Sequence, residues 1–127
     1  MEKNTYYKYL FLIAALWNII ISILLVLILM ISPNSAKLFG VAVPPSFIWA
    51  YSFFFFVFLF GLLFYLTSRN LEIYQKLANI YVVEKVGIFL IFLIYLILGD
   101  INFLGFSLSI GDLIFGILFL EFSINYK

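Results

Sequence analysis

Four long apolar stretches fill almost all of this chain of 127 residues. They cover roughly residues 9–31, 46–67, 77–98 and 103–124. A membrane-spanning helix needs about 20 consecutive apolar residues, so each stretch is long enough to cross a bilayer once. Only 10% of the residues are charged, whereas soluble domains carry about a quarter. The sequence therefore predicts an all-α integral membrane protein whose residues 1–127 form one membrane domain with four spans.

The composition also excludes several kinds of chemistry. The chain has no cysteine and no histidine, which removes disulfides, thiolate chemistry, the usual zinc sites and histidine-ligated haem. A formal charge of +1 gives no basic surface for nucleic acid. No phosphate-binding, dinucleotide-binding or nucleophile-elbow motif is present. We therefore expect no metal, no cofactor, no nucleic-acid partner and no identifiable catalytic residue.

Turn-forming residues mark the ends of the spans. Ser32-Pro33-Asn34-Ser35 ends the first span, and the linker that follows, up to Pro44-Pro45, is apolar enough to lie at the membrane interface. The most polar stretch, residues 68–76, is expected to be a short loop, and residues 99–102 are expected to form a turn. Because short connections make sequence neighbours antiparallel, the prediction is an up-down four-helix bundle.

Two alternative interpretations of the spans fit less well. A secretory signal peptide would have an apolar region of roughly 7–15 residues and a small-residue cleavage site, but the first stretch is longer and has Trp17 and Asn18 in its middle. An interfacial helix over residues 71–85 would leave too short a segment after Asp112 for a fourth crossing.

Lysine and arginine counts predict the orientation. The side of the membrane that holds both termini would carry five such residues, and the opposite side would carry only Lys37. The five are Lys3, Lys8, Arg69, Lys76 and Lys127. The positive-inside rule therefore places both termini and the loop at residues 68–76 in the cytoplasm, for a multi-pass protein of the cytoplasmic (inner) membrane.

Small and polar residues interrupt the first and fourth spans at helical spacing. Asn18 lies near the middle of the first span, with Ser22 one turn later. In the fourth span, Ser109, Asp112 and Gly116 follow Gly105 at intervals that place all four on one face. Such faces let membrane helices approach closely and exchange hydrogen bonds. The simplest interpretation is that both faces are packing seams directed to the interior of the bundle.

Glu84 and Lys85 lie well inside the third span. Insertion scales assign about 2.5–3.5 kcal/mol to each charge at the centre of a membrane helix, so each charge is expected to have a partner. Adjacent residues point about 100° apart on a helix and are not expected to pair with each other. Asp112 is the natural counter-ion of Lys85, although span midpoints place the two roughly 10 Å apart along the membrane normal. Asn18 lies at nearly the same depth and could satisfy a remaining donor or acceptor.

The polar cluster permits a structural and a functional interpretation. As a structural feature, a Lys85–Asp112 bridge would fix the helix register. As a functional feature, the cluster would be an intramembrane pocket for a head group, a small ligand or a proton, since charges within membranes are functional-site candidates. Glu84 would then be a surplus acid that must be protonated, hydrated or held by another subunit. The candidate ligand-binding residues are Asn18, Glu84, Lys85 and Asp112, with Ser22, Tyr81, Ser109 and Gly116 as helix-packing or pocket-lining residues.

The chain also resembles a largely uncharacterised group of small four-span bacterial membrane proteins that are DoxX-like in general plan. The resemblance covers nearly the whole chain and depends on a few short marks. These are Trp17-Asn18, Pro44-Pro45, Arg69-Asn70, Lys85, and Gly111-Asp112 with Phe115. It implies a four-helix bundle in the cytoplasmic membrane and supplies no substrate. DoxX proteins are linked with respiratory or thiol-related oxidation, and the absence of cysteine in this chain weighs against carrying that role over.

Three functional classes stay open at this stage. The protein could bind a lipid-like or quinone-like amphipathic molecule at the polar cluster, because ligand sites between bundle helices are common. It could be a structural or accessory subunit of a larger membrane complex, or form a homo-oligomer, with its charges only fixing register. It could also be a proton-coupled carrier or an acid/base enzyme that uses Glu84 or Asp112. Binding is the favoured prediction, and enzymatic activity is the least favoured.

Overall fold

The protein is described by a computed structural model that covers residues 2–126. Helices and short connections make up this part of the chain, which contains no strand. The long helices are α1 (Lys3–Ile31), α2 (Ile48–Arg69), α4 (Ala78–Leu98) and α5 (Phe103–Asn125), and the short ones are η1 (Pro33–Phe39), α3 (Leu71–Tyr74) and η2 (Gln75–Leu77). By length and composition, four helical segments are suited to crossing a membrane. The all-α prediction with four spans is therefore confirmed. Lys127, which contributed to the predicted charge asymmetry, lies outside the described residues.

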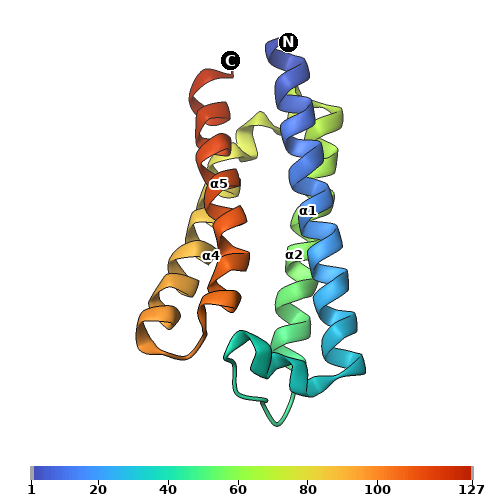
Figure 1. Ribbon diagram of the computed structural model, residues 1–127. Helices are drawn as coiled ribbons and strands as arrows, with labels where there is room; N and C mark the ends of the chain where they lie inside the picture. Colours follow the sequence, from blue (N-terminus) through green and yellow to red (C-terminus); the bar gives the residue numbers. More distant parts are fainter. Residues whose placement is uncertain (1, 127) are drawn as a thin grey trace. The chain divides into compact units, whose positions relative to one another are not determined.

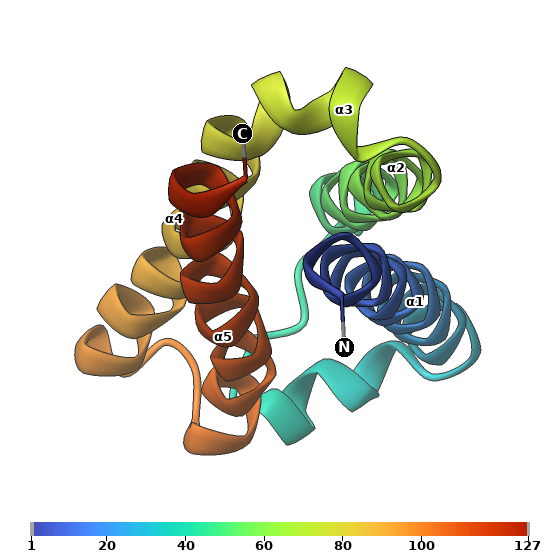
Figure 2. The same cartoon turned by 90° about the horizontal axis from the view of Figure 1, so that it is seen from above.

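The chain divides into two compact units, each built around a helical hairpin. The first unit contains the residues up to Ser32 together with Pro44–Gln75, and the second contains Pro33–Val43 together with the residues from Lys76 onward. The predicted antiparallel order of sequence neighbours is seen within both hairpins, α1 with α2 and α4 with α5 (Figure 1). Figure 2 shows the same two pairs from the end of the helices. The prediction of a single membrane domain stays a prediction.

In the first hairpin, α1 and α2 approach closely at Gly61. A Cβ atom on Gly61 would lie 2.8 Å from Ile19 Cγ1 and 3.3 Å from the carbonyl oxygen of Ala15. These distances leave no room for a larger side chain without a shift of one helix. The buried side of α1 is lined by small and aromatic residues, including Ala14, Ala15 and Phe11. The absence of a side chain at Gly61 thus lets α1 and α2 approach closely, beside a buried pair of large aromatic rings, Phe11 and Phe64.

In the second hairpin, residues 99–102 form the predicted turn between α4 and α5. Gly99 ends α4 in the left-handed conformation, with φ of 85°, which glycine adopts without a steric penalty. Asn102 begins α5, and its side-chain oxygen accepts a hydrogen bond of 2.9 Å from the backbone N–H of Gly105. These two residues satisfy backbone groups that the helix ends leave without partners.

The connection after α1 packs against the second hairpin instead of forming an unstructured linker. Its 3-10 helix η1 contacts α5. The backbone N–H of Asn102 donates to Phe39 O at 2.9 Å, and its side-chain amide donates to Leu38 O at 2.7 Å. A Cβ atom on Gly105 would lie only 2.8 Å from Phe39 O. The sequence indicated an apolar, interfacial segment here but not its attachment to the start of α5.

The loop predicted between the second and third spans was wrong in detail. Residues 68–76 were expected to be a loop, but α2 continues to Arg69 and the segment after Asn70 is helical again. Asn70 makes this possible, because its side-chain oxygen accepts a hydrogen bond from the N–H of Ile73 and so caps α3. The helix α1 begins at Lys3, before the start near Tyr9 that was expected for the first span. The helices extend beyond the apolar stretches, because polar side chains at the membrane–water interface do not by themselves end a helix.

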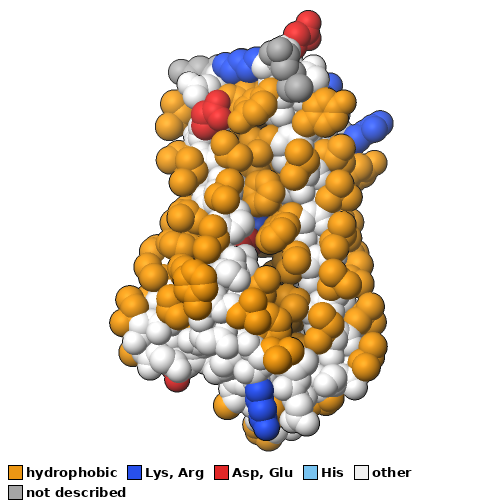
Figure 3. All heavy atoms as spheres, in the orientation of Figure 1, with side chains coloured by type: hydrophobic (Ala, Val, Ile, Leu, Met, Phe, Trp, Pro, Cys, Tyr) orange, Lys and Arg blue, Asp and Glu red, His pale blue; other side chains and the backbone are white. Residues whose placement is uncertain are grey.

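The outer faces of both hairpins are apolar. Hydrophobic side chains cover the visible face of the helices, and most charged side chains lie near the helix ends (Figure 3). Many large apolar residues are highly exposed, such as Trp49 at 82%, Ile31 at 83% and Ile97 at 76%. A water-soluble protein rarely exposes contiguous apolar surface on this scale. This distribution agrees with helices that lipid surrounds.

Candidate functional site

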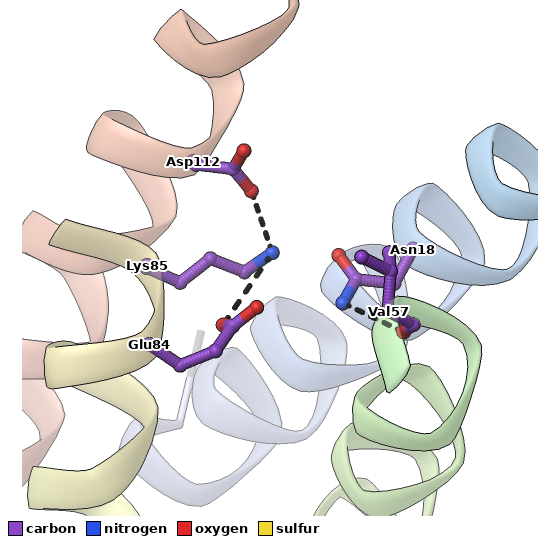
Figure 4. A network of polar contacts seen from close by, with 5 residues as sticks. All are labelled: Asn18, Val57, Glu84, Lys85 and Asp112. Atoms are coloured by element: carbon purple, nitrogen blue, oxygen red, sulfur yellow. Dashed lines mark hydrogen bonds and ion pairs between the residues drawn. The ribbon is translucent and has the colours of Figure 1, made fainter. Parts of the chain in front are cut away.

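The candidate site lies in the second hairpin, where a lysine from α4 meets an aspartate from α5. Lys85 Nζ donates a hydrogen bond of 2.7 Å to Asp112 Oδ1. The Lys85 side chain is 1% exposed and the Asp112 side chain is 15% exposed. Figure 4 shows both side chains reaching toward each other from neighbouring helices. The predicted counter-ion pair is therefore confirmed.

Close packing at Gly116 brings this pair together. A Cβ atom on Gly116 would lie 3.3 Å from Lys85 Cβ and 3.0 Å from Val86 Cγ2. Asp112 lies about one helical turn before Gly116, or roughly 6 Å along α5, and an extended lysine side chain can cover that distance. Two extended side chains thus close the axial separation of roughly 10 Å that the span midpoints predicted, and the bond between them is short.

Glu84 is the third member of the charged cluster. Its Oε2 lies 3.8 Å from Lys85 Nζ, and its side chain is 10% exposed. The expectation that adjacent residues cannot pair was wrong, because both side chains are long enough to bend toward a common point (Figure 4). At 3.8 Å the contact is an ion pair and not a hydrogen bond. Within the described part of the chain, Glu84 Oε2 is buried and accepts no hydrogen bond.

The charge balance of the cluster is uneven. Lys85 contributes one positive charge, while Glu84 and Asp112 contribute two formal negative charges. Lys85 gives its short bond to Asp112 and only the longer contact to Glu84. Phe115 adds an apolar neighbour, with its ring centroid 6.0 Å from Lys85 Nζ. Glu84 Oε2 is therefore the carboxylate oxygen for which the hairpin supplies no hydrogen-bond donor.

Asn18 belongs to the first hairpin. It is 1% exposed, and its side-chain amide donates to the backbone oxygen of Val57 at 3.2 Å. This bond crosses from α1 to α2 beside Gly61, whose added Cβ would lie 3.2 Å from Asn18 Cβ. The packing function expected for this polar residue is thus present within its own hairpin, and its part in the charged cluster stays a prediction.

The residues expected to pack or to line a pocket, Ser22, Tyr81, Ser109 and Gly116, are all buried. The hydroxyl of Ser22 donates to Ile19 O at 3.0 Å, and the hydroxyl of Ser109 donates to Phe106 O at 2.7 Å. Both bonds stay within their own helices, which satisfies the hydroxyl without a partner helix. Tyr81 is fully buried, with its ring 6.2 Å from that of Phe119. The Tyr81 contact joins α4 to α5, while the packing and pocket-lining functions expected for the two serines stay predictions.

Sequence reasoning missed two features of the structure. Gly61 sets the helix approach in the first hairpin, and a lone glycine in an aromatic-rich span was a signal that could have found it. A hollow of about 660 Å³ also lies along the start of α2, in the first unit. Its lining residues are Ser46, Phe47, Ile48, Tyr51, Ser52, Phe55 and Phe56. None of the charged cluster lines it.

The cluster offers ionic and hydrogen-bonding chemistry and little else. No group of three or more histidine, cysteine, aspartate or glutamate side chains lies close enough to hold a metal ion among residues 2–126.

Comparison with protein-family models, with curated proteins and with solved structures gives no match for this chain. The resemblance to DoxX-like proteins stays a prediction.

Proposed function

We propose that this small multi-pass protein binds an amphipathic, lipid-like or quinone-like molecule at the cluster of Glu84, Lys85 and Asp112. The observation that carries the proposal is the buried Glu84 oxygen that accepts no hydrogen bond next to a lysine that is already bonded to Asp112. An unused acceptor in an apolar environment costs free energy, since burial removes its bonds to water. A bound polar group would remove that cost.

A structural bridge alone would not need three charged residues. Lys85 and Asp112 already form a short bond that fixes the register of α4 against α5. Glu84 adds a further charge about six residues, or roughly 9 Å, from the start of α4. Each charge at such depth opposes membrane insertion, so an additional acid is costly unless it has a separate role. An amphipathic ligand suits this position, because its apolar part would lie in lipid while its polar part reaches the cluster.

We also propose that the protein lies in the cytoplasmic membrane with both termini in the cytoplasm. The support is the distribution of basic residues in the segments between and beside the four helices. Lys3, Lys8, Arg69 and Lys76 would lie on the cytoplasmic side, and Lys37 in η1 on the other. Cysteine-accessibility labelling at Lys37 and Lys76, in this cysteine-free chain, tests the proposal directly.

Native mass spectrometry of the protein released from mild detergent micelles tests ligand binding. The expected result is a retained amphiphile on the wild-type protein that is reduced in Glu84→Gln and unchanged in Glu72→Gln. The second variant is a matched control, because Glu72 is an exposed acid in the short helix α3. Equal retention by all three proteins, or retention by none, would contradict the proposal. Reproducible co-purification of other membrane subunits without any retained amphiphile would favour an accessory subunit instead.

A further inference from the structure

We infer that the ligand of this cluster donates a hydrogen bond to Glu84 Oε2 through an ammonium or hydroxyl head group. This inference rests on the proposed function and narrows it to one chemical class. A ligand whose polar group only accepts hydrogen bonds, such as a ketone or an ether, does not meet the need of a carboxylate. The distinction follows from which atom of the cluster lacks a partner.

The hydrogen bond that the cluster lacks has a definite direction. An ionised carboxylate has only acceptor sites, and its Oε2 atom in Glu84 is buried and accepts no hydrogen bond in the described structure. Lys85 Nζ is too far away to serve, at 3.8 Å, and bonds to Asp112 instead. The complement of an unused acceptor is a donor.

The formal charge of the cluster also favours a donor that is positively charged. One lysine faces two carboxylates, which leaves one formal negative charge among three side chains that are each at least 85% buried. A primary ammonium supplies both a compensating positive charge and an N–H donor, and charge-assisted bonds are roughly twice as strong as neutral ones. A hydroxyl supplies the donor alone. An ammonium group is therefore favoured over a hydroxyl group, and both are favoured over acceptor-only groups.

The position of Glu84 along its helix favours a ligand with an apolar chain. Glu84 and Lys85 lie about 10 Å from the start of α4, with apolar residues on both sides along the helix. The flanking residues Ile80 and Val83 are exposed apolar residues of the same helix. An alkyl chain can lie along such a surface while its head group reaches the carboxylate. This favours an amphiphile over a small water-soluble amine with the same head group.

Binding of chemically matched probes tests the inference. Dodecylamine, dodecanol and 2-dodecanone share a chain length and differ in their head groups, and n-butylamine keeps the ammonium but not the long chain. Native mass spectrometry in a neutral maltoside detergent measures their affinities for the wild-type protein. We expect dodecylamine to bind most tightly, dodecanol less tightly, and the other two weakly. In Glu84→Gln, dodecylamine should bind about 10- to 100-fold more weakly, because a charge-assisted bond is lost, and Glu72→Gln should match the wild type.

Different failures of this experiment lead to different conclusions. If 2-dodecanone binds as well as dodecylamine and Glu84→Gln weakens both to the same extent, the donor inference is overturned while ligand binding at the cluster stands. If n-butylamine binds as tightly as dodecylamine, the requirement for an amphiphile is overturned. If no probe binds and no amphiphile is retained on the purified protein, both the inference and the proposed function fail.

A second measurement needs no variant, and so holds even if Glu84→Gln does not fold. Dodecyltrimethylammonium carries the same charge and chain as dodecylamine but has no N–H group. The inference predicts at least tenfold weaker binding of the trimethylated probe to the wild-type protein. Equal affinities would show that charge alone attracts the probe and would overturn the proposed hydrogen bond.

Discussion

Removal of the lysine from the charged cluster is the most informative test of its energetics. In Lys85→Met the short bond to Asp112, 2.7 Å, and the ion pair with Glu84, 3.8 Å, are both lost. Two buried carboxylates then have no cation. Removal of one partner of a buried ion pair costs about 3–5 kcal/mol. We therefore expect Lys85→Met to shift the unfolding equilibrium by roughly two to four powers of ten.

The two acids should contribute unequally, and the geometry gives the order. Because Coulomb energy scales with the inverse of distance, the Asp112 contact is about 1.4 times stronger than the Glu84 contact at equal dielectric. Asp112→Asn also weakens a hydrogen bond to a charged group, worth about 1.5–3 kcal/mol, but leaves Glu84 as a counter-ion. Glu84→Gln loses no hydrogen bond at Oε2, so its cost should be about 1 kcal/mol or less. The expected order of destabilisation is Lys85→Met, then Asp112→Asn, then Glu84→Gln.

The assay is reversible unfolding in mixed micelles, with increasing SDS and helix content followed by circular dichroism. A triple variant that combines Glu84→Gln, Lys85→Met and Asp112→Asn should recover most of the stability lost in Lys85→Met alone, because no buried charge is left in it. If Glu84→Gln destabilised the hairpin as much as Lys85→Met does, Glu84 would be part of the structural bridge. That result would refute the reasoning that treats it as the surplus group.

Three further predictions follow from close contacts in the two hairpins. Gly116→Ala should be less stable than the control variant Gly87→Ala by about 1–3 kcal/mol in the same assay. A Cβ atom at Gly116 would lie 3.0 Å from Val86 Cγ2, whereas one at Gly87 meets nothing within 4 Å. Equal stabilities would show that α4 and α5 separate freely. Asn18→Leu should lower the free energy of unfolding by about 1 kcal/mol, because it removes the hydrogen bond to Val57 O. An unchanged midpoint of SDS unfolding would show that this bond is dispensable. Asn102→Ala should lower the free energy of unfolding by about 1–2 kcal/mol and speed amide hydrogen exchange at the start of α5. Asn102 both caps that helix and donates a hydrogen bond to the backbone of η1. Unchanged exchange at the start of α5 would contradict this capping function.

The four membrane-length helices could be predicted from the sequence alone. Their apolar stretches are long enough to require lipid, and backbone groups in lipid must bond within a helix. The turn at Gly99–Asn102 was also predictable, since glycine and asparagine suit helix ends. Helix ends near residues 68–76 were not, because a change in polarity marks the membrane boundary and not the end of a helix.

The pairing of Lys85 with Asp112 was predictable as well, because a charge within a membrane span needs an opposite charge from another span. What the sequence could not give was the distance. The register depends on how closely α5 approaches α4, and only the tertiary structure shows that Gly116 sits against Lys85.

The sequence by itself thus determined that lipid surrounds the helices, how many spans there are and which charged residues lie within them. These properties follow from the length, hydropathy and charge of successive segments along the chain. Only the tertiary structure decided that the linker after α1 attaches to α5 through Asn102. It also decided that Lys85 donates its short bond to Asp112 and that Glu84 Oε2 is buried without a hydrogen bond. The physical reason is that both carboxylates compete for one ammonium group. Helix packing, which no local pattern encodes, determines which of them lies within hydrogen-bonding distance.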